Sequence, residues 1–221
     1  MFDRIARRYD LMNRLMSLGM DAGWRRVAAQ TAFGAGATQV LDVATGTGDL
    51  AIDLARLGIP LVVGLDFSGA MLHAARAKVE VAAPGRIRLV RGDALSLPFG
   101  NGTFDAVTIG FGLRNMPDYA AAIEEMGRVL KPGGRLVILE MTPVQTPVLR
   151  DVFGLYFDRL VPALGGLVSG DRDAYGYLPR SVGAFPPVES LTDLMRAAGL
   201  RNVRYRAFAL GTVAMHVGIR R

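Results

Sequence analysis

Between residues 38 and 140, short apolar runs alternate with segments of helical periodicity, and this alternation constrains the fold more than any other feature. Five of the runs have the length and apolar content of buried parallel strands. They are Gln39–Ala44, Leu61–Leu65, Ile87–Val90, Asp105–Ile109 and Arg135–Leu139. The alternation predicts an α/β protein with a mostly parallel sheet and helices on both faces.

The joins between these strands support the prediction. Ser68 is a favourable N-cap residue, and the apolar side chains that follow it recur at helical spacing. A second helical pattern runs to Leu130 and is stopped by the sequence Lys131-Pro132-Gly133-Gly134. We expect both helices to pack on the sheet.

The segments on either side of this core predict a cover and a cap within one domain. Residues 2–30 have the spacing of two short helices, broken near Gly19 and Gly23. A helix from Val188 to Ala198 and two strands, Val203–Ala209 and Thr212–Ile219, complete a seven-stranded sheet. The expected segments of the domain 1–221 are an N-terminal helical cover (1–36), the βαβ core (37–142), an inserted cap and substrate region (143–190), and a terminal helix and strand pair (191–221).

Composition excludes several classes of protein. The 221 residues include no Cys, which excludes a disulfide scaffold, a thiolate metal site and a Cys nucleophile. The first residues carry closely spaced charges and lack the apolar region of a signal peptide. The most apolar late stretch, 152–168, contains Asp158 and Arg159, which are costly in lipid. We therefore expect a cytoplasmic protein with no membrane-spanning helix.

The charge of the chain is basic and is carried by arginine. There are 26 Lys and Arg against 20 Asp and Glu, and the only two lysines are Lys78 and Lys131. Many of the arginines lie near the two ends, including Arg4, Arg7, Arg8, Arg14, Arg201, Arg204, Arg206, Arg220 and Arg221. This bias fits a solvated surface, or a basic face that contacts the inner side of a membrane. Nucleic-acid binding is disfavoured because the basic residues are not interleaved with aromatic ones.

A glycine turn follows the first predicted strand and opens a helix. Its sequence is Gly46-x-Gly48-x-x-Ala51. Glycines at such a turn allow a ligand to approach the backbone closely and permit positive φ. The pattern also satisfies a relaxed dinucleotide fingerprint, so the turn alone leaves the ligand open.

Acidic residues at three successive strand ends narrow the choice of ligand. Asp66 is placed to bind both hydroxyls of a ribose, and Asp93 is placed to receive the amino group of an adenine. Asp42, near the glycine turn, suits a cationic amino group. The set favours S-adenosylmethionine over a pyrophosphate ligand such as NAD, which Asp49 at the helix start would oppose. The alternative is that these acids are helix N-caps.

Longer segments carry a family resemblance across nearly the whole chain. The most specific are Tyr9-Asp10-Leu11-Met12-Asn13 and Phe111-Gly112-Leu113-Arg114-Asn115, and others run from Arg128 to Arg135, end in Glu140, and include Tyr175-Gly176-Tyr177-Leu178. In these segments the chain resembles the quinone-biosynthesis C-methyltransferases, which act on demethylmenaquinone and on ubiquinone-precursor benzoquinols. The resemblance implies a Rossmann-like class I methyltransferase fold and S-adenosylmethionine as methyl donor, with no metal.

The resemblance also bears on individual residues. Thr47, Asp66, Asp93 and Ala94 match the cofactor residues of the family, and they join Asp42, Gly46 and Gly48 as our candidate cofactor site. Three positions depart from the family. The chain has Asp21 where His is common, Thr142 where Ser is common, and Gly110 where ubiquinone-forming members have Ser. The departure at Gly110 favours demethylmenaquinol as the acceptor.

Methylation of a hydroquinone carbon needs a phenolate or a base, and two residues are our catalytic candidates. Arg114 follows the fourth strand, and its guanidinium can hold a quinol oxygen or orient a water. The phenol of Tyr9 can bond a quinol hydroxyl from the N-terminal cover. The alternatives are a structural ion pair for Arg114 and a packed aromatic for Tyr9. We expect His73 to lie on the surface and His216 to be structural.

The expected function is C-methylation of a polyprenyl hydroquinone. Demethylmenaquinol is the preferred acceptor, and a benzoquinol precursor of ubiquinone is the alternative. Residues 152–168 are apolar and rich in aromatics, and they could form a groove for the polyprenyl tail. The alternative is that they form ordinary core and the contact surface of a homodimer. Another small-molecule acceptor and an NAD-dependent oxidoreductase remain as alternative enzymes. A nucleic-acid-binding protein remains as the alternative from another class.

Overall fold

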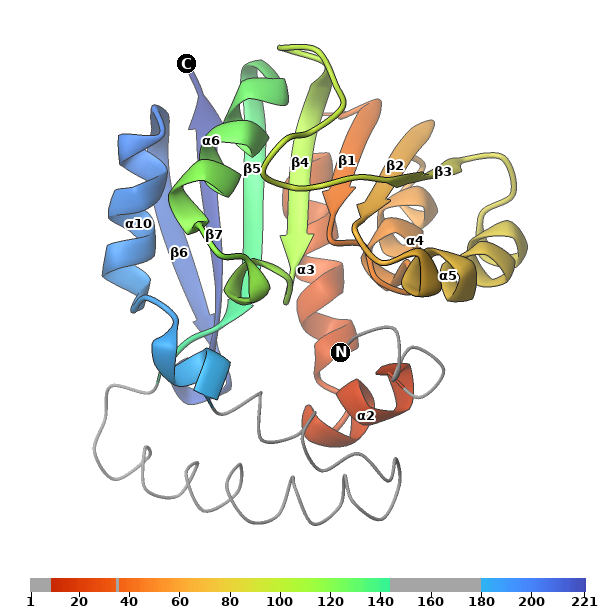
Figure 1. The fold of residues 1–221 in the computed structure, drawn as a ribbon, viewed down its shortest axis with the longest axis horizontal. Coiled ribbons are helices and arrows are strands. Elements are labelled where there is room, and N and C mark those ends of the chain that lie inside the picture. Colours follow the sequence, from red (N-terminus) through yellow and green to blue (C-terminus); the bar gives the residue numbers. More distant parts are fainter. Residues whose placement is uncertain (1–8, 35, 144–179) are drawn as a thin grey trace.

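The computed structural model describes residues 9–34, 36–143 and 180–221, and a seven-stranded sheet runs through them (Figure 1). The strand order is β3-β2-β1-β4-β5-β7-β6. The first five strands of this order pair in parallel, and β7 is antiparallel to both β5 and β6. The strands are β1 (Gln39–Val43), β2 (Leu61–Asp66), β3 (Ile87–Arg91), β4 (Phe104–Gly110), β5 (Leu130–Met141), β6 (Leu200–Phe208) and β7 (Val213–Arg220). The predicted seven-stranded, mostly parallel sheet is confirmed.

Helices cover both faces of this sheet, as expected for parallel strands that are buried on both sides. The helices with full bounds are α2 (Tyr9–Met16), α3 (Asp21–Phe33), α4 (Asp49–Arg56), α5 (Gly69–Ala82), α6 (Tyr119–Val129) and α10 (Val188–Ala197). Apolar side chains of α3, α4 and α5 pack on one face, and those of α6 and α10 pack on the other. Ser68 caps α5 as predicted, since its hydroxyl accepts a hydrogen bond from the Met71 N–H at 3.1 Å.

The structure differs from the prediction in the N-terminal helices. The break between α2 and α3 lies at residues 17–20, where Leu18 and Gly19 have φ of 51° and 76°. Gly23, also predicted to lie near the break, is inside α3 and is exposed. An exposed Gly costs a helix about 1 kcal/mol relative to Ala. Burial of Ala28, Ala29 and Ala32 on the same helix offsets that cost.

Strand β5 begins five residues earlier than its predicted start at Arg135. The backbone of Leu130 pairs with Phe104, and the register then shifts before the regular ladder with β4 resumes. Gly133 makes this shift feasible because its φ of 80° is in the left-handed region. Helix α6 therefore ends at Val129, one residue before its predicted end at Leu130, and the residues Lys131–Gly134 lie within β5.

The carboxyl ends of the parallel strands meet at one edge of the sheet, and α2 lies beyond that edge (Figure 1). The short 3-10 helix η1 (Leu113–Asn115) follows β4 at the same edge, and a second one, η3 (Ala209–Gly211), joins β6 to β7. Most of the predicted cap at 143–190 lies outside the described residues, so the division into segments stays a prediction. Among the residues that the structure describes, no helix is long and apolar enough to cross a membrane.

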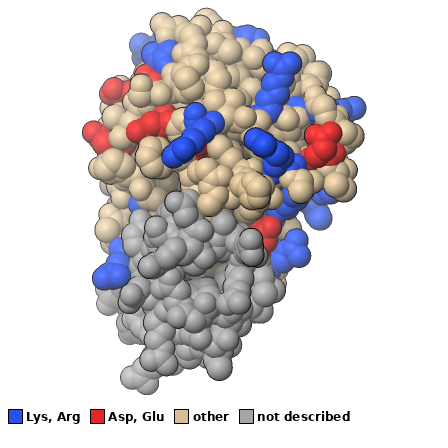
Figure 2. All heavy atoms as spheres, turned by 45° about the vertical axis from the view of Figure 1, so that its right-hand side comes forward, with Lys and Arg blue, Asp and Glu red and all other residues tan. Residues whose placement is uncertain are grey.

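Basic side chains are scattered over the surface. In the face drawn in Figure 2, Lys and Arg are spread among acidic residues over the described part of the chain. On the edge strand β6, Arg201, Arg204 and Arg206 are exposed. The arginines at positions 4, 7 and 8 lie outside the described residues, so the proposed basic face at both ends stays a prediction.

Candidate active site

The turn between β1 and α4 has a backbone that most residues adopt only with strain. Ala44, Gly46 and Gly48 all have positive φ, of 52°, 57° and 85°. At Gly48, a Cβ atom would lie 2.8 Å from Cγ1 of Val79 on α5. Glycine at this position therefore allows both the left-handed backbone and the close approach of α5.

Asp66, at the end of β2, holds the turn in place. Its Oδ2 accepts a hydrogen bond from the Gly46 N–H at 2.8 Å, and its Oδ1 accepts one from the Ser68 N–H at 2.9 Å. The carboxylate is largely buried and borders the cavity described next. Bonds to the charged form of a carboxylate are stronger than those between neutral groups, so Asp66 links β2 firmly to the glycine turn.

A cavity of about 400 Å³ opens at the carboxyl ends of β1, β2, β3 and β4. Four predicted cofactor residues line it: Gly46, Asp66, Asp93 and Ala94. The rest of the lining is mostly apolar and comes from β2, α5 and the segment after β4; it includes Leu65, Phe67, Met71, Phe111 and Met116. The apolar side chains suit a flat, apolar part of a ligand, and the two carboxylates suit hydroxyl or amino groups attached to it.

A second, smaller cavity of about 50 Å³ adjoins the first and shares Ala44, Gly46, Gly110 and Phe111 with it. Two more predicted cofactor residues, Asp42 and Thr47, line this cavity. The remaining lining includes Asp10, Asn13, Arg25 and Asp49. Three aspartates and one arginine give the small cavity a strongly polar lining, with carboxylate oxygens that can accept hydrogen bonds from a ligand. Gly48 lines neither cavity and instead forms the left-handed start of α4.

Asp42 is the most deeply buried of the predicted acids. Its Oδ2 accepts a hydrogen bond from the Thr45 hydroxyl at 2.6 Å, and its Oδ1 accepts one from the Thr108 hydroxyl at 2.7 Å. Burial raises the pKa of Asp42 to about 7, despite these two hydrogen bonds, and the charge of nearby Asp66 adds to the rise. Asp42 thus forms the floor of the small cavity, and its contact with a cationic ligand stays a prediction.

Arg114, our first catalytic candidate, is held by an acid that the sequence did not single out. Its guanidinium Nη1 lies 2.5 Å from Oε1 of Glu140 and donates to the Phe111 carbonyl at 2.7 Å. The Arg114 N–H donates to the other Glu140 oxygen at 3.1 Å. Glu140 is fully buried near the end of β5. The ion pair weighed as an alternative for Arg114 is therefore present, and it holds the guanidinium next to residues that line the larger cavity.

Glu140 shares a sequence signal with the other acids of the site. Like Asp42 and Asp66, it stands near the carboxyl end of a buried parallel strand. In the sequence it stands out only as the end of a segment that resembles the family. Its partner could not be predicted, because Arg114 lies 26 residues away and meets it only once β4 and β5 pair.

The remaining candidates are placed as follows. Tyr9 begins α2, and its side chain lies outside what the structure describes, so its catalytic role stays a prediction. His73 is exposed, as predicted. His216 is fully buried with its Nε2 3.0 Å from the Val188 carbonyl oxygen, and burial lowers its pKa, as expected of a structural residue.

Comparison with known proteins gives a consistent result. The model of the ubiE/COQ5 methyltransferase family matches residues 1–220. Two similar proteins are the demethylmenaquinone methyltransferases of Deinococcus radiodurans and Thermus thermophilus; each is 51% identical over all of this chain and over 91% and 100% of its own length. A protein of Syntrophotalea carbinolica, named ubiquinone/menaquinone biosynthesis C-methyltransferase UbiE, is 45% identical over all of this chain and 92% of its own length.

Solved structures support the fold. An S-adenosylmethionine-dependent methyltransferase from Aquifex aeolicus superposes with a TM-score of 0.63 at 18% identity, covering 95% of this chain and 96% of its own. An O-methyltransferase family protein from Burkholderia thailandensis superposes with a TM-score of 0.70 at 22% identity, covering 96% of this chain and 59% of its own. At these identities the likeness establishes the fold alone, and the predicted Rossmann-like methyltransferase architecture is confirmed.

The raised pKa of Asp42 predicts a pH-dependent stability. Between pH 3.8 and about 7, the folded protein keeps the proton on Asp42, whereas the unfolded chain has released it. The stabilising contribution of Asp42 is therefore complete below pH 3.8 and is lost as the pH rises through about 7. The free energy of unfolding of the wild type minus that of Asp42→Asn, which is neutral throughout, should be about 2.5 kcal/mol larger at pH 5 than at pH 8. Urea unfolding at the two pH values measures this difference. A difference that is independent of pH would contradict the assignment.

The burial of Glu140 predicts that it is essential to stability. Glu140→Gln leaves the guanidinium of Arg114 without its buried counter-charge and should lower the free energy of unfolding by about 3 kcal/mol. The matched control is Glu125→Gln, which removes a more exposed pair with Arg128 and should cost about 1 kcal/mol. Urea unfolding measures the loss in the free energy of unfolding for both variants. An equal loss in Glu125→Gln and Glu140→Gln would contradict the prediction.

Proposed function

The chain belongs to the ubiE/COQ5 methyltransferase family, and from this premise we propose that it transfers a methyl group from S-adenosylmethionine to a ring carbon of demethylmenaquinol. The observation that carries the proposal is the full-length similarity, at 51% identity, to two proteins named demethylmenaquinone methyltransferase. The product of the reaction is menaquinol, so the protein acts in menaquinone biosynthesis.

The two adjoining cavities fit the parts of S-adenosylmethionine. In the larger one, Asp66 binds the ribose hydroxyls, and Asp93 with Ala94 receives the adenine. In the smaller one, Asp42 and Thr47 face the methionine end, and the carboxyl group of Asp42 accepts a hydrogen bond from its ammonium. Gly46 and Gly48 shape the turn between the two parts. The described residues contain no group of three or more His, Asp or Glu able to hold a metal ion, and metal-independent transfer is part of the proposal.

The bound cofactor supplies an activated methyl group on a sulfonium, so the protein's task is to align and activate the acceptor. A quinol hydroxyl loses its proton to water, and the guanidinium of Arg114 stabilises the phenolate. The electron-rich ring carbon forms a bond to the methyl carbon, and the sulfur keeps the electron pair of the broken C–S bond. Water takes the proton from that ring carbon, which restores the aromatic ring, and the phenolate oxygen then takes up a proton from water to give the methylated quinol. Glu140 keeps Arg114 in position throughout, and Tyr9 bonds the second oxygen of the quinol.

Two substitutions separate cofactor binding from methyl transfer. Asp66→Ala removes charged hydrogen bonds to the ribose and should weaken cofactor binding by about 10- to 100-fold. Arg114→Ala should leave cofactor binding within a few fold and lower the turnover number by about 100-fold. Calorimetry with S-adenosylmethionine and a single-turnover assay measure the two effects. If Arg114→Ala has the turnover number of the wild type, the proposed catalytic role of Arg114 is wrong.

The acceptor is tested directly by an assay of the purified protein with labelled methyl donor. We expect methylation of a short-chain demethylmenaquinol to exceed that of a benzoquinol analogue. Gly110 lines both cavities, and a Cβ atom there would lie 3.2 Å from Cδ2 of Leu50, so a Ser at this position would narrow the site. The name of the Syntrophotalea carbinolica relative makes the benzoquinol the second candidate. Preferred methylation of the benzoquinol would reverse the assignment, and tight NAD binding without methyl transfer would overturn it.

Three further parts of the proposal concern residues that the structure does not describe. Residues 152–168 are proposed to hold the polyprenyl tail, and the N-terminal arginines to contact an anionic membrane. Co-sedimentation of the protein with anionic vesicles, compared with the variant neutralised at Arg4, Arg7 and Arg8, tests the second point. A homodimer stays a prediction.

A further inference from the structure

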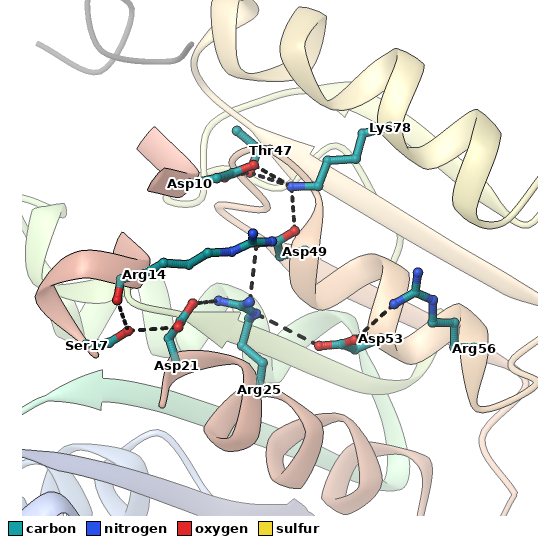
Figure 3. Close-up of polar contacts among 10 residues, drawn as sticks. All are labelled: Asp10, Arg14, Ser17, Asp21, Arg25, Thr47, Asp49, Asp53, Arg56 and Lys78. Carbon is teal, nitrogen blue, oxygen red and sulfur yellow. Dashed lines mark hydrogen bonds and ion pairs between the residues drawn. The ribbon is translucent and has the colours of Figure 1, made fainter. Parts of the chain in front are cut away.

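A group of charged residues that the proposed chemistry does not use joins the N-terminal helix α2 to the glycine turn (Figure 3). Asp10 of α2 accepts a hydrogen bond from the Thr47 hydroxyl at 2.6 Å. The Nζ of Lys78, on α5, lies 2.6 Å from the other oxygen of Asp10 and 2.5 Å from Oδ1 of Asp49. Lys78 thus connects α2 to the first residue of α4, directly after the turn.

Arg25 of α3 lies on the other side of Asp49 (Figure 3). Its Nη2 is 3.3 Å from Oδ2 of Asp49, and its Nη1 is 2.5 Å from Oδ2 of Asp21. Although burial acts to raise the pKa of Asp21, the hydrogen bond from Ser17 and the charge of Arg25 lower it, so Asp21 is firmly ionised. Asp49 therefore bridges two cations, one from α3 and one from α5.

The two halves of this network differ in burial. The side chains of Arg25 and Asp21 are 12% and 6% exposed, whereas those of Lys78 and Asp10 are 30% and 34% exposed. A partly exposed ion pair is weak and is screened by salt, while a buried one is costly to break. The pair of Arg25 and Asp21 is thus a fixed part of the structure, and the contact of Lys78 with Asp10 is the one that can open at low cost.

Opening that contact would uncover the smaller cavity. Asp10 and Asn13 of α2 form part of its lining, and the cavity measures only about 50 Å³. A ligand group in this cavity lies against α2, so a displacement of α2 would enlarge the space open to it. We propose that Lys78 and Asp10 are positioning residues that form a releasable ionic clasp, holding α2 closed over the methionine end of the bound cofactor. This inference rests on the proposed function for the identity of the cofactor.

The clasp also bears on Tyr9, the second catalytic candidate. This residue directly precedes Asp10 in α2, so the contact that holds Asp10 also restrains the backbone of Tyr9. Lys78 lies on α5, outside the lining of both cavities, and acts on the site only through Asp10 and Asp49. It is a positioning residue and not a catalytic one.

The test compares the only two lysines of the chain. Lys78→Met removes the charge and keeps most of the side-chain stem. Lys131→Met is the matched control, because Lys131 forms a 2.6 Å ion pair with Asp105 away from both cavities. Lys78→Met should speed hydrogen exchange of the α2 amides and weaken S-adenosylmethionine binding by about three- to tenfold, the loss expected for two partly exposed ion pairs. Lys131→Met should change neither the exchange of the α2 amides nor the affinity for S-adenosylmethionine. Lys78→Arg, which keeps the positive charge, should leave both at the wild-type level.

Asp10→Asn supplies a second variant that removes the charge from the other side and keeps an oxygen for Thr47. It should speed α2 exchange as Lys78→Met does. The clasp is overturned if α2 exchange in both variants equals that of the wild type, or if cofactor affinity falls without any change in α2 exchange. If the exchange results are as expected but no quinol is methylated, the proposed function fails and the clasp stands.

Discussion

The turn at residues 44–49 is the constraint on which the rest of the site depends. Its backbone passes through three positive-φ positions, and a strand, a carboxylate and a neighbouring helix together hold it there. Asp66 hydrogen-bonds the Gly46 N–H, and α5 packs against Gly48 so closely that a side chain would not fit. Both cavities of the site share this turn as a wall, so its shape sets how the two parts of a ligand are oriented.

Around this turn the protein uses charge in two different ways. The largely buried pair of Arg114 and Glu140 is costly to break, so it fixes the orientation of the guanidinium. The pair of Lys78 and Asp10 is about a third exposed and is correspondingly weak. The proposed chemistry would use both: a rigid guanidinium to hold the acceptor, and a cover that opens for exchange of ligands.

The fold could be predicted largely because its signals are local. All seven predicted strands are present, and Ser68 caps its helix, because apolar runs and capping residues act within a few positions of the chain. The errors arose where packing overrides local preference. Gly23 remains helical because α3 buries three alanines, and β5 starts at Leu130 because Phe104 offers a partner for its backbone. Burial of a larger surface outweighs the preference of one residue.

The sequence by itself determined the class of fold, the glycine turn, and the acids at the strand ends, since each depends on residue type and spacing along the chain. Only the tertiary structure decided which charges meet. Glu140 reaches Arg114 across paired strands, and Lys78 reaches Asp10 across 68 residues. It also decided that Asp42 is buried deeply enough to raise its pKa to about 7. Ion pairing and desolvation depend on distances between segments far apart in the sequence, and those distances exist only after the chain has folded.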